Sequence, residues 1–160
     1  MFQRLVMVLA LFATTSWASS PDAPQLPTKK YLNLAAIKIM VAAAEAEAQK
    51  LNVQVTICVV DESANLLFLE KADGASLNTI QFAQKKAGHA ALYRSPSKDA
   101  ADTVKKGSVE ALAFPSFFPV QGGLPISADG QVLGAIACSG AKSEIDEQIA
   151  QAGIDALFKK

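Results

Sequence analysis

Glycines are concentrated between residues 122 and 140, and this block constrains the fold more than any other part of the chain. Gly122-Gly123 and Ser139-Gly140 flank two apolar runs, and Ala128-Asp129-Gly130 separates the runs. Apolar runs joined by an Asp-Gly turn are typical of a β-hairpin. Glycines at the ends of strands indicate positive φ angles or a close approach of other atoms. The block therefore predicts a hairpin whose outer ends lie against another part of the protein.

The first 18 residues have the composition of a secretory signal peptide. Arg4 precedes a short apolar run, and Ser16-Trp17-Ala18 places small residues where a signal peptidase cleaves. The apolar run is short for a membrane span. We expect cleavage after Ala18 and export to the periplasm or out of the cell, the alternative being an uncleaved N-terminal anchor.

Residues 19–28 contain three prolines and no apolar periodicity, which predicts an extended Pro-rich tether. Residues 29–160 are long enough for a single domain with its own core. Removing Arg4 from the 15 basic residues leaves 14 against 15 acidic ones. Such a balance lacks the basic excess of a nucleic-acid-binding surface. Apart from residues 1–18, no segment suggests contact with a membrane.

Periodicity predicts an α/β (α+β) chain with an antiparallel sheet and helices on both of its faces. Thr28 is the predicted cap of the first helix and Ser143 of the last. A short edge strand is predicted after Pro115, before the hairpin. The predicted elements are helix 29–50, strands 53–60 and 66–71, helices 76–92 and 97–106, the edge strand, the hairpin, and helix 143–158.

An ordered series of motifs over residues 32–157 resembles the GlcG/HbpS-type haem-binding family. The C-terminal part of some corrinoid adenosyltransferases is similar. The series comprises Val59-Val60-Asp61, Asp73-Gly74-Ala75, Ala83 to Ala87, Gly122 to Ile126, Asp129-Gly130, Gly134-Ala135-Ile136, Ser139-Gly140, Asp146-Glu147 and Ala152-Gly153. The resemblance implies a profilin-like three-layer α/β/α sandwich with a five-stranded antiparallel sheet, and homo-oligomers. It also implies haem binding, with haem degradation or iron handling in some members.

His89, the only histidine, is a candidate ligand of haem iron, and Tyr93 one turn later is the alternative. Nearby Lys85, Lys86 and Arg94 are candidates for holding the propionates. The opposing interpretation is that His89 is an ordinary, partly exposed helix residue.

Lys86 also matches a basic position of the family. Packed against Gly122-Gly123, its ammonium and free backbone N–H groups would form an anion pocket, with Asp73 as acceptor. The motif positions Gly74, Pro125, Ser139 and Gly140 complete the set of candidate ligand-binding residues. The alternative is a structural ion pair between Lys86 and Asp73, with the glycines serving tight turns.

Cys58 and Cys138 lie in predicted strands, and export permits a disulfide between them. Two buried thiols are the alternative. Phe114, Phe117 and Phe118 are expected to fill the core, to line an apolar pocket, or to form a subunit contact.

The sequence contains none of the common catalytic signatures, which favours a binding protein over an enzyme. Haem binding is the leading hypothesis. The two alternatives are a protein that binds or converts a small anionic metabolite at the Lys/Asp/Gly-Gly pocket, and an oligomeric scaffold.

Overall fold

A four-stranded antiparallel sheet in the order β2-β1-β4-β3 organises the chain. The computed structural model describes residues 26–159; the predicted signal peptide and most of the tether lie outside this range. The elements are α1 (Leu34–Lys50), β1 (Thr56–Asp61), β2 (Leu66–Lys71), α2 (Thr79–Tyr93), α3 (Ser97–Lys105), the 3-10 helix η1 (Val109–Ala113), β3 (Gly123–Ala128), β4 (Gln131–Ser139) and α4 (Ser143–Phe158).

The central strands β1 and β4 are the most apolar ones. All residues from Thr56 to Val60 are buried, as expected for a β-branched run with neighbours on both sides. Thr56 pairs with Lys71 of β2 and with Ser139 of β4. The predicted antiparallel pairing is confirmed.

The prediction of a fifth strand is wrong for the part of the chain that the structure describes. After Pro115 the backbone runs as an irregular loop that follows η1 and leads into β3. Pro115 and Pro119 have no N–H to donate to a neighbouring strand, and Ser116 takes a positive φ of 58°. These residues instead form a wall above α2.

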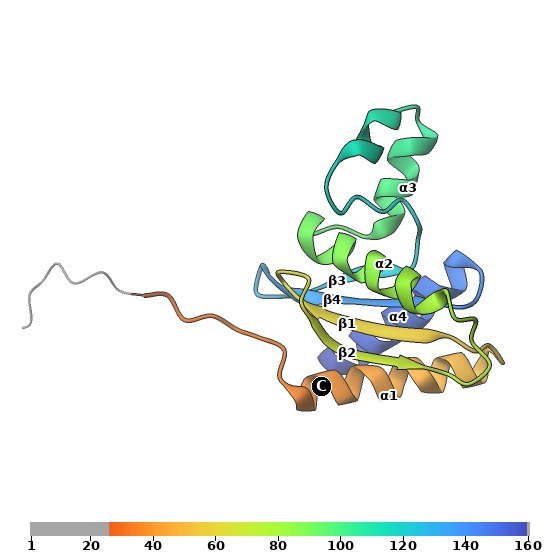
Figure 1. Ribbon diagram of the computed structural model, residues 1–160. Coiled ribbons are helices and arrows are strands. Elements are labelled where there is room, and N and C mark those ends of the chain that lie inside the picture. The colour runs from red at the N-terminus through yellow and green to blue at the C-terminus, as the bar shows by residue number, and fades with distance from the viewer. Residues whose placement is uncertain (1–25, 160) are drawn as a thin grey trace, which may run out of the picture.

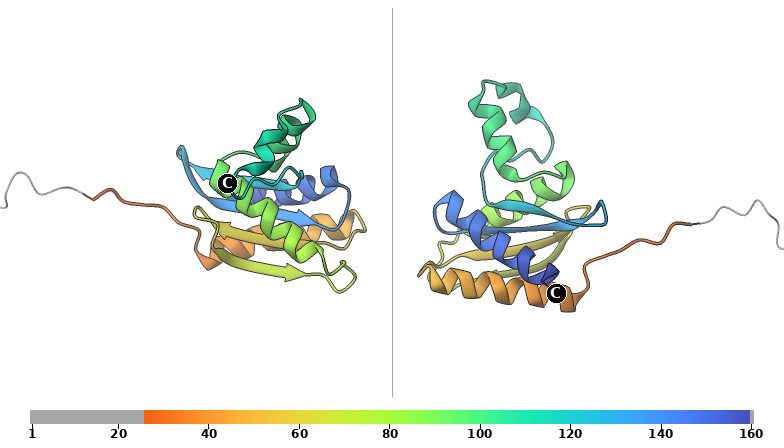
Figure 2. Two further views of the ribbon diagram at one scale, coloured as in Figure 1. Left: turned by 45° about the horizontal axis from the view of Figure 1, so that its top comes forward. Right: turned by 180° about the vertical axis from the view of Figure 1, so that it is seen from behind.

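Helices cover both faces of the sheet (Figures 1 and 2). On one face, α1 and α4 pack through large apolar residues such as Met40 and Ile149 against strand residues such as Ile136. On the other, α2 packs through alanines, including Ala83 and Ala87, on a surface of small residues. Small side chains on both partners allow α2 to lie close to the strands.

Residues 97–113, which we call the α3–η1 arm, extend away from the sheet beyond α2 (Figures 1 and 2). Ser97, Ala100 and Ala111 are its only buried residues. Val109 and Leu112 expose more than half of their surfaces. The arm thus contributes little to the core.

The first helix begins later than predicted. Asn33 caps it, because its side-chain oxygen accepts a hydrogen bond from the Ala36 N–H at 2.8 Å. Thr28 lies in an extended segment well before that point. At α4 the capping position is Lys142, so Ser143 is the first helical residue instead of the cap.

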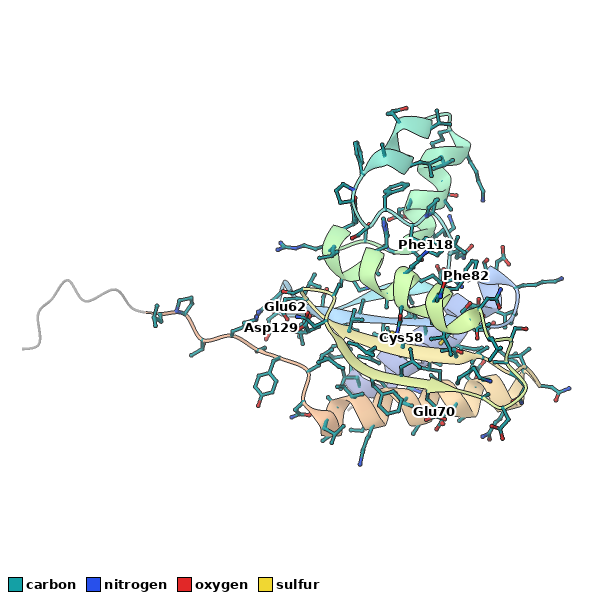
Figure 3. All side chains as sticks on the ribbon, in the orientation of Figure 1. Cys58, Glu62, Glu70, Phe82, Phe118 and Asp129 are labelled. Carbon is teal, nitrogen blue, oxygen red and sulfur yellow. The ribbon has the colours of Figure 1, made fainter. Side chains whose placement is uncertain are left out.

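The predicted hairpin is confirmed. Asp129 and Gly130 connect β3 to β4 with φ angles of 49° and 76°, as in a type I′ turn. The segment before α1 reaches both hairpin tips, since Lys30 pairs with Asp129 and Lys29 with Glu62. Figure 3 shows Glu62 and Asp129 close to one another at that end of the sheet.

The two cysteines are free, buried thiols. Cys138 pairs with Ile57, whereas Cys58 pairs with Ala137. Adjacent residues of a strand point to opposite faces, so the two thiols lie on opposite sides of the sheet. A disulfide between them is excluded by this register, and burial raises the pKa of Cys58 to about 12.

No helix within residues 26–159 is both long and apolar enough to cross a membrane.

Gly123 is required where β3 passes beneath α2. A Cβ atom at this position would lie 2.4 Å from the backbone oxygen of Lys86. We therefore expect Gly123→Ala to lower the free energy of unfolding by about 2 kcal/mol or more, measured by urea denaturation.

The matched control is Gly130→Asn in the hairpin turn. A Cβ there has no neighbour within 4 Å, and asparagine tolerates the positive φ. Its cost should stay below about 1 kcal/mol. Equal costs for the two variants would contradict the close approach of β3 and α2.

Candidate functional site

A cavity of about 400 Å³ lies between α2 and the loop that follows the arm. This volume is within the usual range for small-molecule sites. Its walls combine apolar side chains with one cation. The residues that line this α2 cavity are Ala64, Gln84, Lys85, Gly88, His89, Leu92, Ser116, Phe117 and Phe118.

Helical spacing explains which residues of α2 face the cavity. One side of the helix carries Lys85, Gly88, His89 and Leu92, because these residues follow one another at intervals of three, one and three. Gly88 has no side chain, which leaves room above the helix. The Lys85 ammonium lies 5.6 Å from the ring centre of Phe118, in a cation–π contact.

The opposite side of the cavity is formed by residues 114–118, which we call the aromatic wall. Tyr93 holds it by donating a hydrogen bond from its hydroxyl to the Pro115 carbonyl at 2.8 Å. The Phe118 N–H donates to Nδ1 of His89 at 3.2 Å. The Phe118 ring meets Phe82 edge-to-face, with centroids 5.7 Å apart (Figure 3). Side chains of α2 thus position the wall.

His89 is buried, with 1% of its surface exposed. Its ring stacks on Tyr93 at a centroid distance of 4.4 Å and meets Phe117 edge-on. Burial lowers the pKa of His89, although the Ser116 carbonyl and the charge of Asp99 oppose this. The ring is therefore neutral at neutral pH.

This geometry does not support His89 as an iron ligand. Because Nδ1 accepts the Phe118 N–H, the neutral ring carries its proton on Nε2. Neither nitrogen then offers a free lone pair. The hydroxyl of Tyr93, the alternative ligand, is engaged with Pro115. The interpretation of His89 as a partly exposed residue is also wrong, because the ring is buried.

Lys86 points the other way from the cavity, into the protein. Its ammonium donates to Oδ2 of Asp146 at 2.7 Å and to the Cys138 carbonyl at 3.0 Å. Both charged side chains are almost fully buried. A Cβ at Gly122 would lie 2.8 Å from Nζ of Lys86, so the predicted proximity of Lys86 to Gly122-Gly123 is observed.

Asp146, rather than Asp73, is the partner of Lys86. Its Oδ1 also accepts the Ala141 N–H at 2.9 Å, so the protein's own carboxylate fills the predicted anion pocket. Burial raises the pKa of Asp146, and the Lys86 ammonium opposes that rise. In the sequence, Asp146 belongs to the Asp146-Glu147 motif, which assigned it no partner.

The other predicted ligand-binding residues are divided between two places. Ser139 and Gly140 lie with Lys86 and Asp146 around a polar cavity of about 290 Å³. Pro125 pairs with Ala135 within the sheet. Asp73 and Gly74 are exposed in the loop after β2, where Gly74 approaches the side chain of Gln54. The structure thus does not bring the whole set together.

Removing one member of the Lys86–Asp146 pair should be costly, because it leaves a buried charge without a partner. We expect Lys86→Met to lower the free energy of unfolding by about 3–5 kcal/mol in urea denaturation. The double variant Lys86→Met/Asp146→Asn should recover part of this loss, since the remaining amide oxygen can still accept the Ala141 N–H. A double variant less stable than the single one would contradict this account.

A second titratable pair lies on the α1 side of the sheet. Glu45 of α1 and Glu70 of β2 line a cavity of about 160 Å³, and Figure 3 marks Glu70. Hydrogen bonding to Glu70, followed by burial, raises the pKa of Glu45 to about 7. Glu45 therefore carries a proton below that pH.

The folded chain binds this proton more tightly than the unfolded chain. The stability that the proton on Glu45 contributes is complete below pH 4.5 and is lost as the pH rises through about 7. We expect the free energy of unfolding of Glu45→Gln, relative to that of the parent, to be higher at pH 8 than at pH 5. Urea denaturation of both proteins at the two pH values measures this difference. An equal difference at the two pH values would contradict the raised pKa of Glu45.

Comparison with known proteins identifies the family. The family described as "Haem degrading protein HbpS-like" matches residues 32–155, so the chain belongs to it. Protein GlcG of Escherichia coli K12 is 34% identical over 114 residues, which is 71% of this chain and 85% of GlcG. An uncharacterised 15.0 kDa protein of the Citrobacter freundii dhaT-dhaS intergenic region is 33% identical, covering 78% of this chain and 90% of its own.

Several solved structures superpose on this chain. Klebsiella pneumoniae protein ORFY superposes with a TM-score of 0.78 at 28% identity, over 87% of this chain and 99% of its own. The PduOC:heme complex has a TM-score of 0.74 at 27% identity, over 79% and 95% of the two chains. HbpS has a TM-score of 0.77 at 29% identity, over 84% and 96%.

Proposed function

We propose that the protein binds haem in the α2 cavity and acts after export from the cytoplasm. The supporting observation is an apolar cavity with a cation at its edge, in a chain related to a protein whose structure is a haem complex. The N-terminal sequence supports export.

The lining residues suit the ring of a tetrapyrrole. Leu92, Phe117 and Phe118 offer apolar contact to a flat macrocycle, and Gly88 leaves space against the helix. The Lys85 ammonium is placed to pair with a propionate. Bound haem would supply an iron centre, but His89 and Tyr93 are already committed to the aromatic wall. The proposal is therefore for binding, and we derive no step of degradation.

The alternative of a free anion held by Lys86 has less support. The Asp146 carboxylate already neutralises that ammonium at 2.7 Å. An incoming anion would have to displace a buried carboxylate that also accepts the Ala141 N–H.

We further propose that the protein forms homo-oligomers through the α3–η1 arm. More than half of the surface is exposed on Val109 and Leu112 of the arm and on the adjoining Phe114. Clustered exposed apolar side chains favour a protein contact.

Filling the cavity should weaken haem binding. A Cβ at residue 88 meets only the Cβ of Ala64, at an ordinary 3.8 Å, so Gly88→Ala is the control that preserves the space. Gly88→Leu extends into the cavity while improving helix propensity. In hemin titrations followed by the Soret band, we expect parent-like binding by Gly88→Ala and at least about tenfold weaker binding by Gly88→Leu, which is about 1.4 kcal/mol.

Two results would overturn the proposal. One is the absence of saturable hemin binding by the parent protein. The other is equal affinity of the alanine and leucine variants, which would place the hemin elsewhere.

A further inference from the structure

We propose that His89 is a proton-controlled latch that positions the aromatic wall of the α2 cavity. The residue acts through the wall and does not itself contact the iron. The consequence for ligand affinity rests on the proposed function, whereas the latch itself is a property of the protein alone.

The hydrogen bond between Phe118 and His89 fixes the protonation state of the ring. A backbone N–H can only donate, so Nδ1 must hold a lone pair. In the imidazolium form both ring nitrogens carry hydrogen. The Nδ1–H would then face the Phe118 N–H, and two donors cannot form a hydrogen bond with each other. Protonation therefore breaks the hydrogen bond that ties the Phe118 backbone to α2.

The wall has few other attachments to the body of the protein. Tyr93 holds Pro115, and Phe117 packs edge-on against the rings of His89 and Tyr93. The Phe118 ring contacts Phe82 and Lys85 of α2, but these contacts do not involve its backbone. The Phe117 N–H donates to the Phe114 carbonyl, which lies within the wall itself. Phe114 exposes 54% of its surface. Segments with few buried contacts open at low cost. Loss of the His89 hydrogen bond should thus free the Phe118 backbone from α2 and loosen this wall of the cavity.

The charges around His89 define the pH range. Lys85 and Tyr93 lie on its own helix, and Asp99 of α3 is the acidic group whose charge raises the His89 pKa. Burial outweighs Asp99 and the Ser116 carbonyl, so the pKa lies below the ordinary 6.5. The folded state therefore favours the neutral ring. The latch is closed at neutral pH and opens as the pH falls through the lowered pKa.

Nuclear magnetic resonance tests the latch directly, because the chain has one histidine. The side-chain 15N shifts at pH 7.5 should show an unprotonated Nδ1 and a proton on Nε2. On acidification, the imidazole and the Phe118 amide should shift together, with one midpoint below pH 6.5. A proton on Nδ1 at pH 7.5, or a Phe118 amide that does not follow the ring, would overturn the proposal.

His89→Asn is the matched variant. Its side-chain oxygen can accept the Phe118 N–H, but it does not titrate between pH 4 and 8. The Phe118 amide should then lose its pH dependence. His89→Ala, which has no acceptor, should show an open wall at every pH. If the alanine variant does not fold, the asparagine variant still decides the question.

Hemin titrations connect the latch to binding. Below the imidazole pKa, the closed fraction of the parent falls about tenfold for each pH unit. The affinity of the parent should fall by the same factor relative to His89→Asn. Identical pH profiles for the two proteins would overturn the latch as a control of binding. If neither protein binds hemin, the proposed function fails, and the amide titration alone decides whether the latch exists.

Discussion

The buried ion pair between Lys86 and Asp146 links the helices on the two faces of the sheet. Lys86 belongs to α2 on one face, and Asp146 to α4 on the other. The two meet at the C-terminal end of β4, where Lys86 also donates to the Cys138 carbonyl. A buried pair of this kind adds little net stability over an apolar contact, but breaking it is costly. It therefore fixes how α2 is placed relative to the sheet.

Close packing of α2 on small residues makes this ion pair possible. Gly122 and Gly123 pass so near to Lys86 that a Cβ at either position would lie within 3 Å of it. The alanines of α2 face the small residues of β1 and β4. With α2 fixed on this inner side, its outer side serves as a rigid base for the α2 cavity. Facing that base across the cavity is the aromatic wall, which His89 and Tyr93 attach to the helix.

Much of the fold could be predicted from local patterns. The Asp129-Gly130 turn, the strands at its sides and the extent of α2 follow from turn chemistry and periodicity. The predicted fifth strand failed because apolar character at Phe117 and Phe118 does not compensate for two prolines nearby. The predicted cap at Thr28 failed because Asn33, closer to the helix, offers its side chain to Ala36.

The candidate site shows which features follow from the sequence and which depend on the tertiary structure. Residue types and spacing alone determined the hairpin and the placement of His89 and Tyr93 one turn apart on a helix, because these depend on short-range geometry. The ordered motifs also carried the resemblance to the family. Only the tertiary structure decided that Lys86 pairs with Asp146, which lies 60 residues away. It also decided that Nδ1 of His89 accepts a hydrogen bond from the backbone of the loop that follows the arm. Periodicity shows which side of a helix is apolar, but not which distant backbone atom will meet a given side chain, since that depends on how the elements pack.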